Sequence, residues 1–106
     1  MTDDLFAGVA GRFKALAEPA RLRILDRLRG GELTVGELGE KTQLNQANLS
    51  KHLQLLHSLE FVTRRKDGLF VYYRLANEDV FQLCDIMCGR LARSPGRVAR
   101  AGRERA

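Results

Sequence analysis

The stretch LTVGELGEKTQLNQANLSKHLQLLHSLEFV, residues 33–62, contains two helix patterns separated by a short polar segment. Thr34 and Glu37 have the three-residue spacing of a capping box, which predicts the start of a short helix. Asn45 is a favourable N-cap for a second helix over residues 46–58. Two helices joined by so short a turn predict a helix-turn-helix.

The second of these helices has a polar face opposite a leucine face. Leu49, Leu53 and Leu56 recur at helical spacing and should pack inward. The other face carries groups that hydrogen-bond to base edges and phosphates, and its candidate DNA contacts are Gln46, Ala47, Asn48, Ser50, Lys51, His52 and Gln54. The alternative is an ordinary solvated helix face. His52 lies beside the leucines, so it could instead make a packing contact.

A pattern of two strands follows this helix. Residues 62–66 and 69–75 are rich in β-branched and aromatic residues, and Asp67-Gly68 between them is a favoured tight turn. Alternation in the second strand predicts an inward set, Val71, Tyr73 and Leu75. Three cations before the turn are candidate contacts to the DNA backbone or minor groove: Arg64, Arg65 and Lys66. The alternative for these cations is a solubilising edge strand.

Helices are also predicted on both sides of this region. The N-terminal helix carries one apolar stripe, Leu5, Phe6, Val9, Phe13 and Leu16. Pro19 disfavours helical geometry in Glu18 and suits the first turn of a helix over residues 20–29. Asn77 is a candidate cap for a last helix over residues 78–92. The order α-α-α-α-β-β-α is a mainly α fold with a β-hairpin (α+β), a winged helix-turn-helix.

The charge of the chain is concentrated at its C-terminal end. Its 106 residues allow one domain, which we place at residues 1–92, followed by a basic flexible tail, residues 93–106. The net charge is +5, but the tail holds five arginines and one glutamate and so carries +4 of it. The domain is left with +1, so basicity alone is weak evidence for nucleic-acid binding.

The composition is typical of a soluble globular protein, with 44% hydrophobic and 29% charged residues. No apolar run approaches the ~20 residues that span a bilayer. The acidic start, residues 1–4, does not match a secretory signal. We therefore expect a cytoplasmic protein with no membrane partner.

Three stretches resemble the ArsR/SmtB family of bacterial transcriptional repressors. Residues 15–25, ALAEPARLRIL, are similar to the family's entry into its second helix, and residues 49–56, LSKHLQLL, to its recognition helix. Residues 68–75, GLFVYYRL, are similar to its wing and second strand. The resemblance implies a homodimer that pairs through the first and last helices. It also implies binding to double-stranded operator DNA and release by a small inducer, whose identity the sequence does not give.

The chain departs from the family pattern at three places. Residues 32–38 lack the cysteine pair of many metal sensors in the family, and the last helix has no histidine for the family's zinc site. Glu60 stands where the family usually has glycine after the recognition helix. A left-handed residue would be strained at that position for glutamate, so we expect the helix to end differently.

Cys84 and Cys88 are the only cysteines, and they are four residues apart on the last predicted helix. Side chains at this spacing lie one above the other, so two thiolates could bind As(III) or another thiophilic ion such as Cd(II). They could also respond to an oxidant or a reactive sulfur species. The alternative is that both are small hydrophobic residues in a dimer interface. A tetrahedral metal site would need further ligands from elsewhere.

The helix-turn-helix and its polar face favour a sequence-specific DNA-binding repressor that a small inducer releases. A winged helix that binds only a protein partner is the alternative, supported by the nearly neutral domain. An enzyme is not expected, because the chain has no nucleophile–base pair, glycine-rich phosphate loop or recognisable carboxylate pair.

Overall fold

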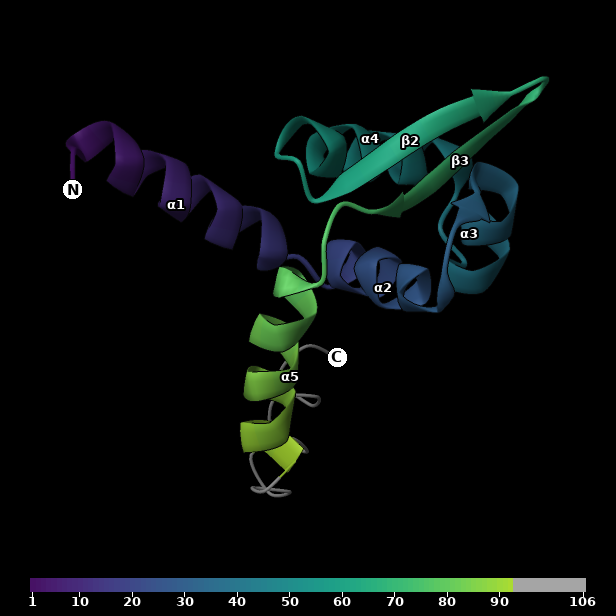
Figure 1. The fold of residues 1–106 in the computed structure, drawn as a ribbon. Coiled ribbons are helices and arrows are strands. Elements are labelled where there is room, and N and C mark those ends of the chain that lie inside the picture. Colours follow the sequence, from purple (N-terminus) through teal and green to yellow (C-terminus); the bar gives the residue numbers. More distant parts are fainter. Residues whose placement is uncertain (93–106) are drawn as a thin grey trace.

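The computed structural model describes residues 1–92 as a winged helix-turn-helix with a small antiparallel sheet (Figure 1). Its elements in chain order are α1 (Asp3–Leu16), α2 (Pro19–Arg27), the 3₁₀ turn η1 (Leu28–Gly30), β1 (Leu33–Thr34), α3 (Val35–Thr42), α4 (Gln46–Ser58), β2 (Val62–Asp67), β3 (Phe70–Leu75) and α5 (Asp79–Ala92). The predicted mainly α fold with a hairpin is confirmed. Residues 93–106, where the sequence predicts the basic tail, lie outside the described part of the chain.

The helix-turn-helix, α3 and α4, is held by the caps that the sequence predicts. The Thr34 hydroxyl accepts a hydrogen bond from the Glu37 amide at 3.1 Å, and the Glu37 carboxylate accepts one from the Thr34 amide at 2.9 Å. This capping box starts α3. The Asn45 side chain accepts from the Asn48 amide at 2.8 Å and starts α4. Gln43, left-handed with φ 62°, ends α3 and turns the chain.

The helices on either side differ slightly from their predicted bounds. α2 ends at Arg27 and continues as η1, where a single predicted helix ran over residues 20–29. α5 begins one residue later than expected. The Asn77 side chain accepts from the Asp79 amide at 3.0 Å, so it stabilises the entry to α5 from one position further back. No helix in residues 1–92 is both long and apolar enough to cross a membrane.

The sheet has the order β1-β3-β2, and β1 is an element that the sequence did not predict. β1 is two residues long and pairs Leu33 with Tyr73, 40 residues away in the chain, so no local pattern marks it. In the hairpin, Asp67 pairs with Phe70, which makes Gly68-Leu69 the connecting turn. The predicted turn, Asp67-Gly68, is therefore wrong by one residue.

Gly68 explains this one-residue difference. It has φ +61°, while Leu69 is not among the residues with positive φ. A positive φ at the first turn position alone follows the type II′ pattern, in which glycine stands first. The inward set on β3 is as predicted, because Tyr73 is buried and Val71 and Leu75 pack against the core.

The core lies where α2, α3 and α4 meet the inner face of the sheet. Its buried side chains are Ile24, Leu25, Leu28, Leu38, Leu49, Leu53, Leu56, Val62, Tyr73 and Val80. The three α4 leucines among them are at most 1% exposed. α4 is thus fixed on the body of the protein through its apolar side.

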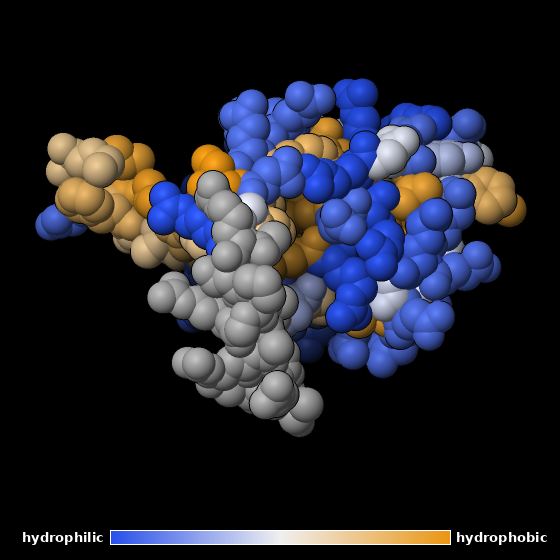
Figure 2. All heavy atoms as spheres, turned by 90° about the horizontal axis from the view of Figure 1, so that it is seen from below, coloured by the Kyte–Doolittle hydropathy of each residue, from blue (hydrophilic) through white to orange (hydrophobic). Residues whose placement is uncertain are grey.

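α1 and α5 project from this body (Figure 1), and the parts of their apolar stripes beyond Leu16 and Val80, which pack on the core, stay mostly exposed. Figure 2 shows hydrophobic residues gathered on the projecting α1. The exposed apolar residues of the two helices are Leu5, Phe6, Val9, Phe13, Leu83, Ile86, Met87 and Leu91. Exposed apolar surface of this kind is typical of an interaction site.

The end of α4 corrects the expectation made for Glu60. Glu60 adopts the left-handed conformation, with φ 66°. Its amide donates to the His57 carbonyl at 3.0 Å, and the Phe61 amide donates to the Leu56 carbonyl at 2.9 Å. These two bonds form a Schellman motif, the usual glycine C-cap, so the expectation that the helix ends differently is wrong. The helix end keeps its geometry despite the Cβ of glutamate.

The substitution Glu60→Gly should therefore stabilise the protein. Glycine removes the left-handed penalty, and we expect the free energy of unfolding to rise by about 1 kcal/mol in urea titrations at fixed chain concentration. Glu60→Ala is the matched control, since it removes the same carboxylate but keeps a Cβ in the left-handed region. An equal rise in both variants would show that charge, and not backbone strain, is responsible.

Candidate nucleic-acid interface

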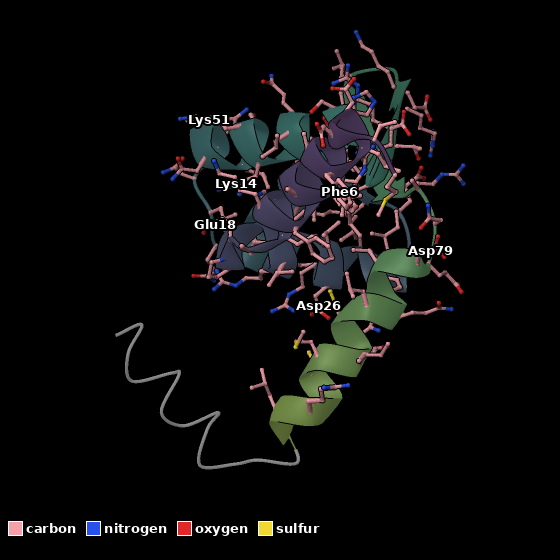
Figure 3. The ribbon with its side chains drawn as sticks, turned by 90° about the vertical axis from the view of Figure 1, so that its left-hand side faces the viewer. Phe6, Lys14, Glu18, Asp26, Lys51 and Asp79 are labelled. Carbon is pink, nitrogen blue, oxygen red and sulfur yellow. The ribbon has the colours of Figure 1, made fainter. Side chains whose placement is uncertain are left out.

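The polar face of α4 points away from the body of the protein. Gln46, Ala47, Asn48, Lys51 and Gln54 are exposed, and Ser50 and His52 are half-buried. Figure 3 shows Lys51 projecting from the outer side of the helix. Most of the face that the sequence predicts for DNA contact is therefore open to solvent, while Ser50 and His52 lie partly covered at its side.

His52 is joined to α2 through Arg21. The Arg21 Nη1 lies 3.3 Å from His52 Nδ1, and the Arg21 Nε donates to the Ala15 carbonyl at 2.5 Å near the end of α1. Since arginine can only donate, Nδ1 is the acceptor, and a neutral His52 carries its proton on Nε2. Burial, and then the Arg21 charge, lower the pKa of His52 and favour this neutral form. The packing alternative considered for His52 thus has a definite partner.

The three cations of β2 are not equivalent. Arg65 donates two hydrogen bonds to Glu32, at 2.7 and 2.8 Å, and its guanidinium lies 4.2 Å from the centre of the Tyr72 ring. The same bonds hold the pKa of Glu32 below its ordinary value. Arg64 and Lys66 are exposed and form no ion pair within residues 1–92. Their charges remain available to a partner, whereas that of Arg65 is already compensated.

Cys84 and Cys88 lie beside each other on α5, over a hollow of about 280 Å³. The hollow is lined also by Leu22 and Leu25 of α2 and by Arg29. Burial, and then Cys88, raise the pKa of the Cys84 thiol, against a smaller opposite effect of Arg29. Cys84 is half-buried and Cys88 is exposed, so a reagent can reach the pair from outside.

The surroundings of the cysteines supply no complete metal site. The neighbouring Asp85 is bound by Arg29, with N–O distances of 2.6 and 2.7 Å. Arg29 also lies over the Phe81 ring, 4.3 Å from its centre. Within residues 1–92 no group of three or more His, Cys, Asp or Glu side chains is placed to hold a metal ion. Two sulfur donors alone suit a two-thiol adduct better than a tetrahedral ion.

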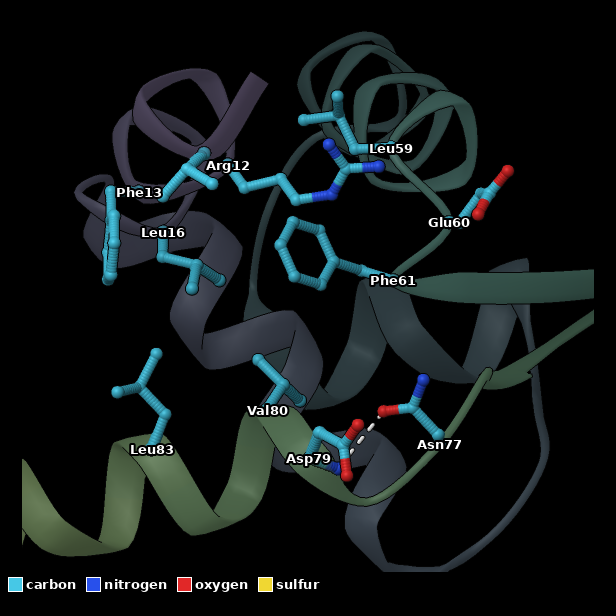
Figure 4. Close-up of a pocket in the computed structure, with 11 residues that line it drawn as sticks. Arg12, Phe13, Leu16, Leu59, Glu60, Phe61, Asn77, Asp79, Val80 and Leu83 are labelled. Atoms are coloured by element: carbon cyan, nitrogen blue, oxygen red, sulfur yellow. Dashed lines mark hydrogen bonds between the residues drawn. The ribbon is translucent and has the colours of Figure 1, made fainter. Parts of the chain in front are cut away.

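A second hollow, of about 360 Å³, lies where α1 and α5 diverge from the end of α4 (Figure 4). Its walls are mainly apolar and include Phe13, Phe61, Val80 and Leu83, with Arg12 at the side of α1. The sequence did not predict it, because it depends on the angle between α1 and α5, which residues 17–78 separate in the chain. It continues the exposed apolar stripes of α1 and α5 toward the body.

Known proteins share both the sequence pattern and the fold of this chain. The sequence model "Bacterial regulatory protein, arsR family" matches residues 18–64. The transcriptional repressor SdpR of Bacillus subtilis (strain 168) is 39% identical over 70 residues, which are 66% of this chain and 77% of SdpR. The crystal structure of Rv0081 from Mycobacterium tuberculosis has a TM-score of 0.80 and 34% identity, covering 92% of this chain and 99% of that one.

A further solved structure is similar in both fold and sequence. The homodimeric winged helix-turn-helix DNA-binding domain Mb0332 from Mycobacterium bovis has a TM-score of 0.74 and 37% identity. The match covers 84% of this chain and 88% of that domain. The similar proteins are transcription regulators and not enzymes. The match to the family model ends at residue 64 and so stops before the tip of the hairpin.

The lowered pKa of His52, caused by burial and then by the Arg21 charge, predicts a pH dependence of stability. Because the folded-state pKa of His52 is below its ordinary value of 6.5, the folded protein binds fewer protons than the unfolded chain between these two values. Its contribution is complete above about pH 6.5 and is lost as the pH falls through the folded-state pKa. Between about pH 7.5 and pH 5, the free energy of unfolding should therefore fall more in the wild type than in His52→Gln.

The matched control for this measurement is His57→Gln, on the same helix. It removes a histidine without touching Arg21, so it should retain the wild-type pH dependence. Equal pH dependence of the wild type and His52→Gln would show that the environment of His52 does not contribute to the pH dependence of stability.

Proposed function

Since this chain belongs to the arsR family of bacterial regulatory proteins, we propose that it is a repressor that reads operator DNA with α4 and the β2–β3 wing. The observation that carries the proposal is the open polar face of α4, opposite leucines that fix the helix on the body. A recognition helix needs both properties, because a base contact requires a rigid support and an unobstructed face. The site of action would be the cytoplasm, where operator DNA is found.

The side chains of α4 divide into base readers and phosphate contacts. Gln46 and Asn48 carry amides that can make paired hydrogen bonds to adenine in the major groove. Ala47 between them can contact a thymine methyl group. Ser50 and Lys51 suit phosphate or base contacts, and Gln54 extends the polar face by one more turn. His52 can offer its Nε2–H outward while Nδ1 stays with Arg21.

The wing adds backbone contacts next to the recognition helix. Arg64 and Lys66 are the cations that we assign to phosphates, because they have no ion pair in the described part of the chain. Arg65 lies on the same strand, but it is bound by Glu32, the residue that precedes β1. We assign Arg65 mainly to fixing the angle of the wing.

A second copy of this chain is the partner that fits the stripes on α1 and α5. Phe13 of α1 and Met87 of α5 are 58% and 57% exposed, values that leave large apolar side chains in water. Pairing through these helices would cover the stripes and present two α4 helices to a symmetric operator. Sedimentation that returned the mass of one 11.9 kDa chain, at concentrations that bind DNA, would contradict this proposal.

The inducer site that we propose is the cysteine pair on α5. The pair faces α2 across the apolar hollow, and α2 also carries Arg21, which contacts α4. A group bound by both sulfurs, As(III) or another thiophilic species, would change how α5 packs on α2. Because α5 also belongs to the proposed dimer contact, such a change would alter the spacing of the two α4 helices.

One observation favours a different function, a winged helix that binds only a protein. Residues 1–92 carry a net charge of +1, so they attract DNA weakly over a distance. A protein partner together with undetectable DNA binding would decide for that function.

The repressor function predicts specific binding that depends on Arg64 and Lys51. The purified chain should select a duplex from a random pool and bind it at least ~10³-fold more tightly than unselected DNA at ~150 mM salt. Arg64→Ala or Lys51→Gln should weaken binding and flatten the plot of log binding constant against log salt concentration. The expected change in slope is about 0.9 per lost phosphate contact, or about 1.8 for a dimer.

Arg65→Ala is the matched control for Arg64→Ala, because it removes the same cation from the next position of β2. Its charge is compensated by Glu32, so it should change the slope by less. Equal slopes for the two variants would remove the distinction drawn here between the wing cations. Failure of the wild type to select any duplex would remove the repressor function itself.

The inducer proposal predicts loss of response in cysteine variants. Sodium arsenite should lower the affinity of the wild type for its selected duplex, and Cys84→Ser/Cys88→Ser should bind DNA normally but ignore arsenite. The single variants should respond more weakly, since a two-sulfur adduct needs both thiolates. A double variant that is still released by arsenite would contradict the assignment. A wild type that ignores arsenite, a peroxide and an organic persulfide would do the same.

A further inference from the structure

The tip of the wing is apolar, which none of the assignments above explains. Leu69 is 96% exposed and Phe70 is 59% exposed, at the end of the hairpin that projects beyond α3 (Figure 1). Turn residues at such a position are usually polar. A leucine side chain held almost wholly in water adds little to folding, and together with Phe70 it makes the tip of the hairpin a small apolar surface that is open to another molecule.

The hairpin places Leu69 at a fixed distance from the body. β2 and β3 form six residue pairs, which at about 3.3 Å per residue make a hairpin of roughly 20 Å. Half a turn of B-DNA is roughly 17 Å, and this separates a major groove from the next minor groove along the duplex. When α4 lies in a major groove, a hairpin of this length can bring its tip to the flanking minor groove.

The charges along the hairpin suit such a position. Arg64 and Lys66, which have no ion pair among residues 1–92, lie on the shaft of the wing, where they would meet phosphates at the groove edge. The acid nearest the tip, Asp67, lies 3.6 Å from Arg65 and is partly neutralised by it. Gly68 and Leu69 carry no charge. The strands of the wing are basic and its tip is apolar. This arrangement complements a DNA groove, whose edges carry phosphates and whose base edges and sugars are less polar.

Of the two apolar tip residues, Leu69 and not Phe70 is free to enter a minor groove. Phe70 pairs with Asp67 at the end of the ladder, and its ring centre lies 6.5 Å from that of Tyr72 on the outer face of the sheet. Leu69 is almost fully exposed in the described part of the chain, and the Gly68 turn fixes the direction of the backbone that carries it.

We propose that Leu69 enters the minor groove beside the α4 site and packs against sugars and base edges there. This inference rests on the proposed repressor function. Apolar side chains in the minor groove favour sequences that widen or unstack easily, such as TA and CA/TG steps. Leu69 would then determine specificity at flanking positions, through DNA deformability instead of hydrogen bonds.

The test compares Leu69→Ser with Leu69→Met on two lengths of the duplex that the wild type selects from a random pool. On a 30-base-pair duplex with a central TA step in each flank, Leu69→Ser should bind roughly tenfold more weakly than the wild type. The salt slope should stay unchanged, because no phosphate contact is lost. Leu69→Met should bind like the wild type. On a duplex trimmed to remove both flanking minor grooves, all three proteins should bind equally.

The outcomes separate this inference from the proposed function. A wild type that selects no duplex contradicts the repressor function, and the inference falls with it. A wild type that binds specifically while Leu69→Ser matches it on the long duplex contradicts the inference alone. A loss that persists on the trimmed duplex, or a fall of the sedimentation mass in Leu69→Ser, would place Leu69 in a contact between copies of this chain and would also overturn it.

Discussion

The burial of three leucines of α4 is the constraint on which the rest of the structure depends. Leu49, Leu53 and Leu56 lie in the core between α2, α3 and the sheet, and each is at most 1% exposed. Their position fixes the rotation of α4 about its own axis, and this sets which side chains face outward. The same packing aligns the start of β2, because Val62 belongs to the same core. The polar face of α4 and the β2–β3 wing are therefore positioned by the same core contacts.

Local signals in the sequence were sufficient for the helix starts and the inward strand residues. Caps such as Thr34 and Asn45 act on amides two or three residues away, so their effect is visible in a short window. β1 was missed because its pairing with β3 is long-range and its two residues have no pattern of their own. At Glu60, the tertiary position of β2 after α4 fixes a left-handed geometry that the residue itself disfavours.

In the candidate site too, some features follow from local sequence signals and others depend on long-range contacts. The outward polar set of α4 follows from helical periodicity, so the sequence predicts its exposed members Gln46, Ala47, Asn48, Lys51 and Gln54. The partners of Arg65 and His52 are 33 and 31 residues away in the chain, and no spacing rule connects them. Without these contacts, the three wing cations look equivalent, and His52 stays undecided between a DNA contact and a packing contact. Only the folded arrangement shows that one cation is already compensated and that one imidazole nitrogen is occupied.

The projection of α1 from the body has a mechanical consequence. A helix of 14 residues is about 21 Å long at about 1.5 Å per residue, so it works as a lever. Tilting such a lever by about 10° moves its far end by roughly 4 Å, which is close to the 3.4 Å rise of one base pair. If two copies pair through their α1 helices, a tilt too small to disturb either core would change the spacing of the two α4 helices by about one base pair.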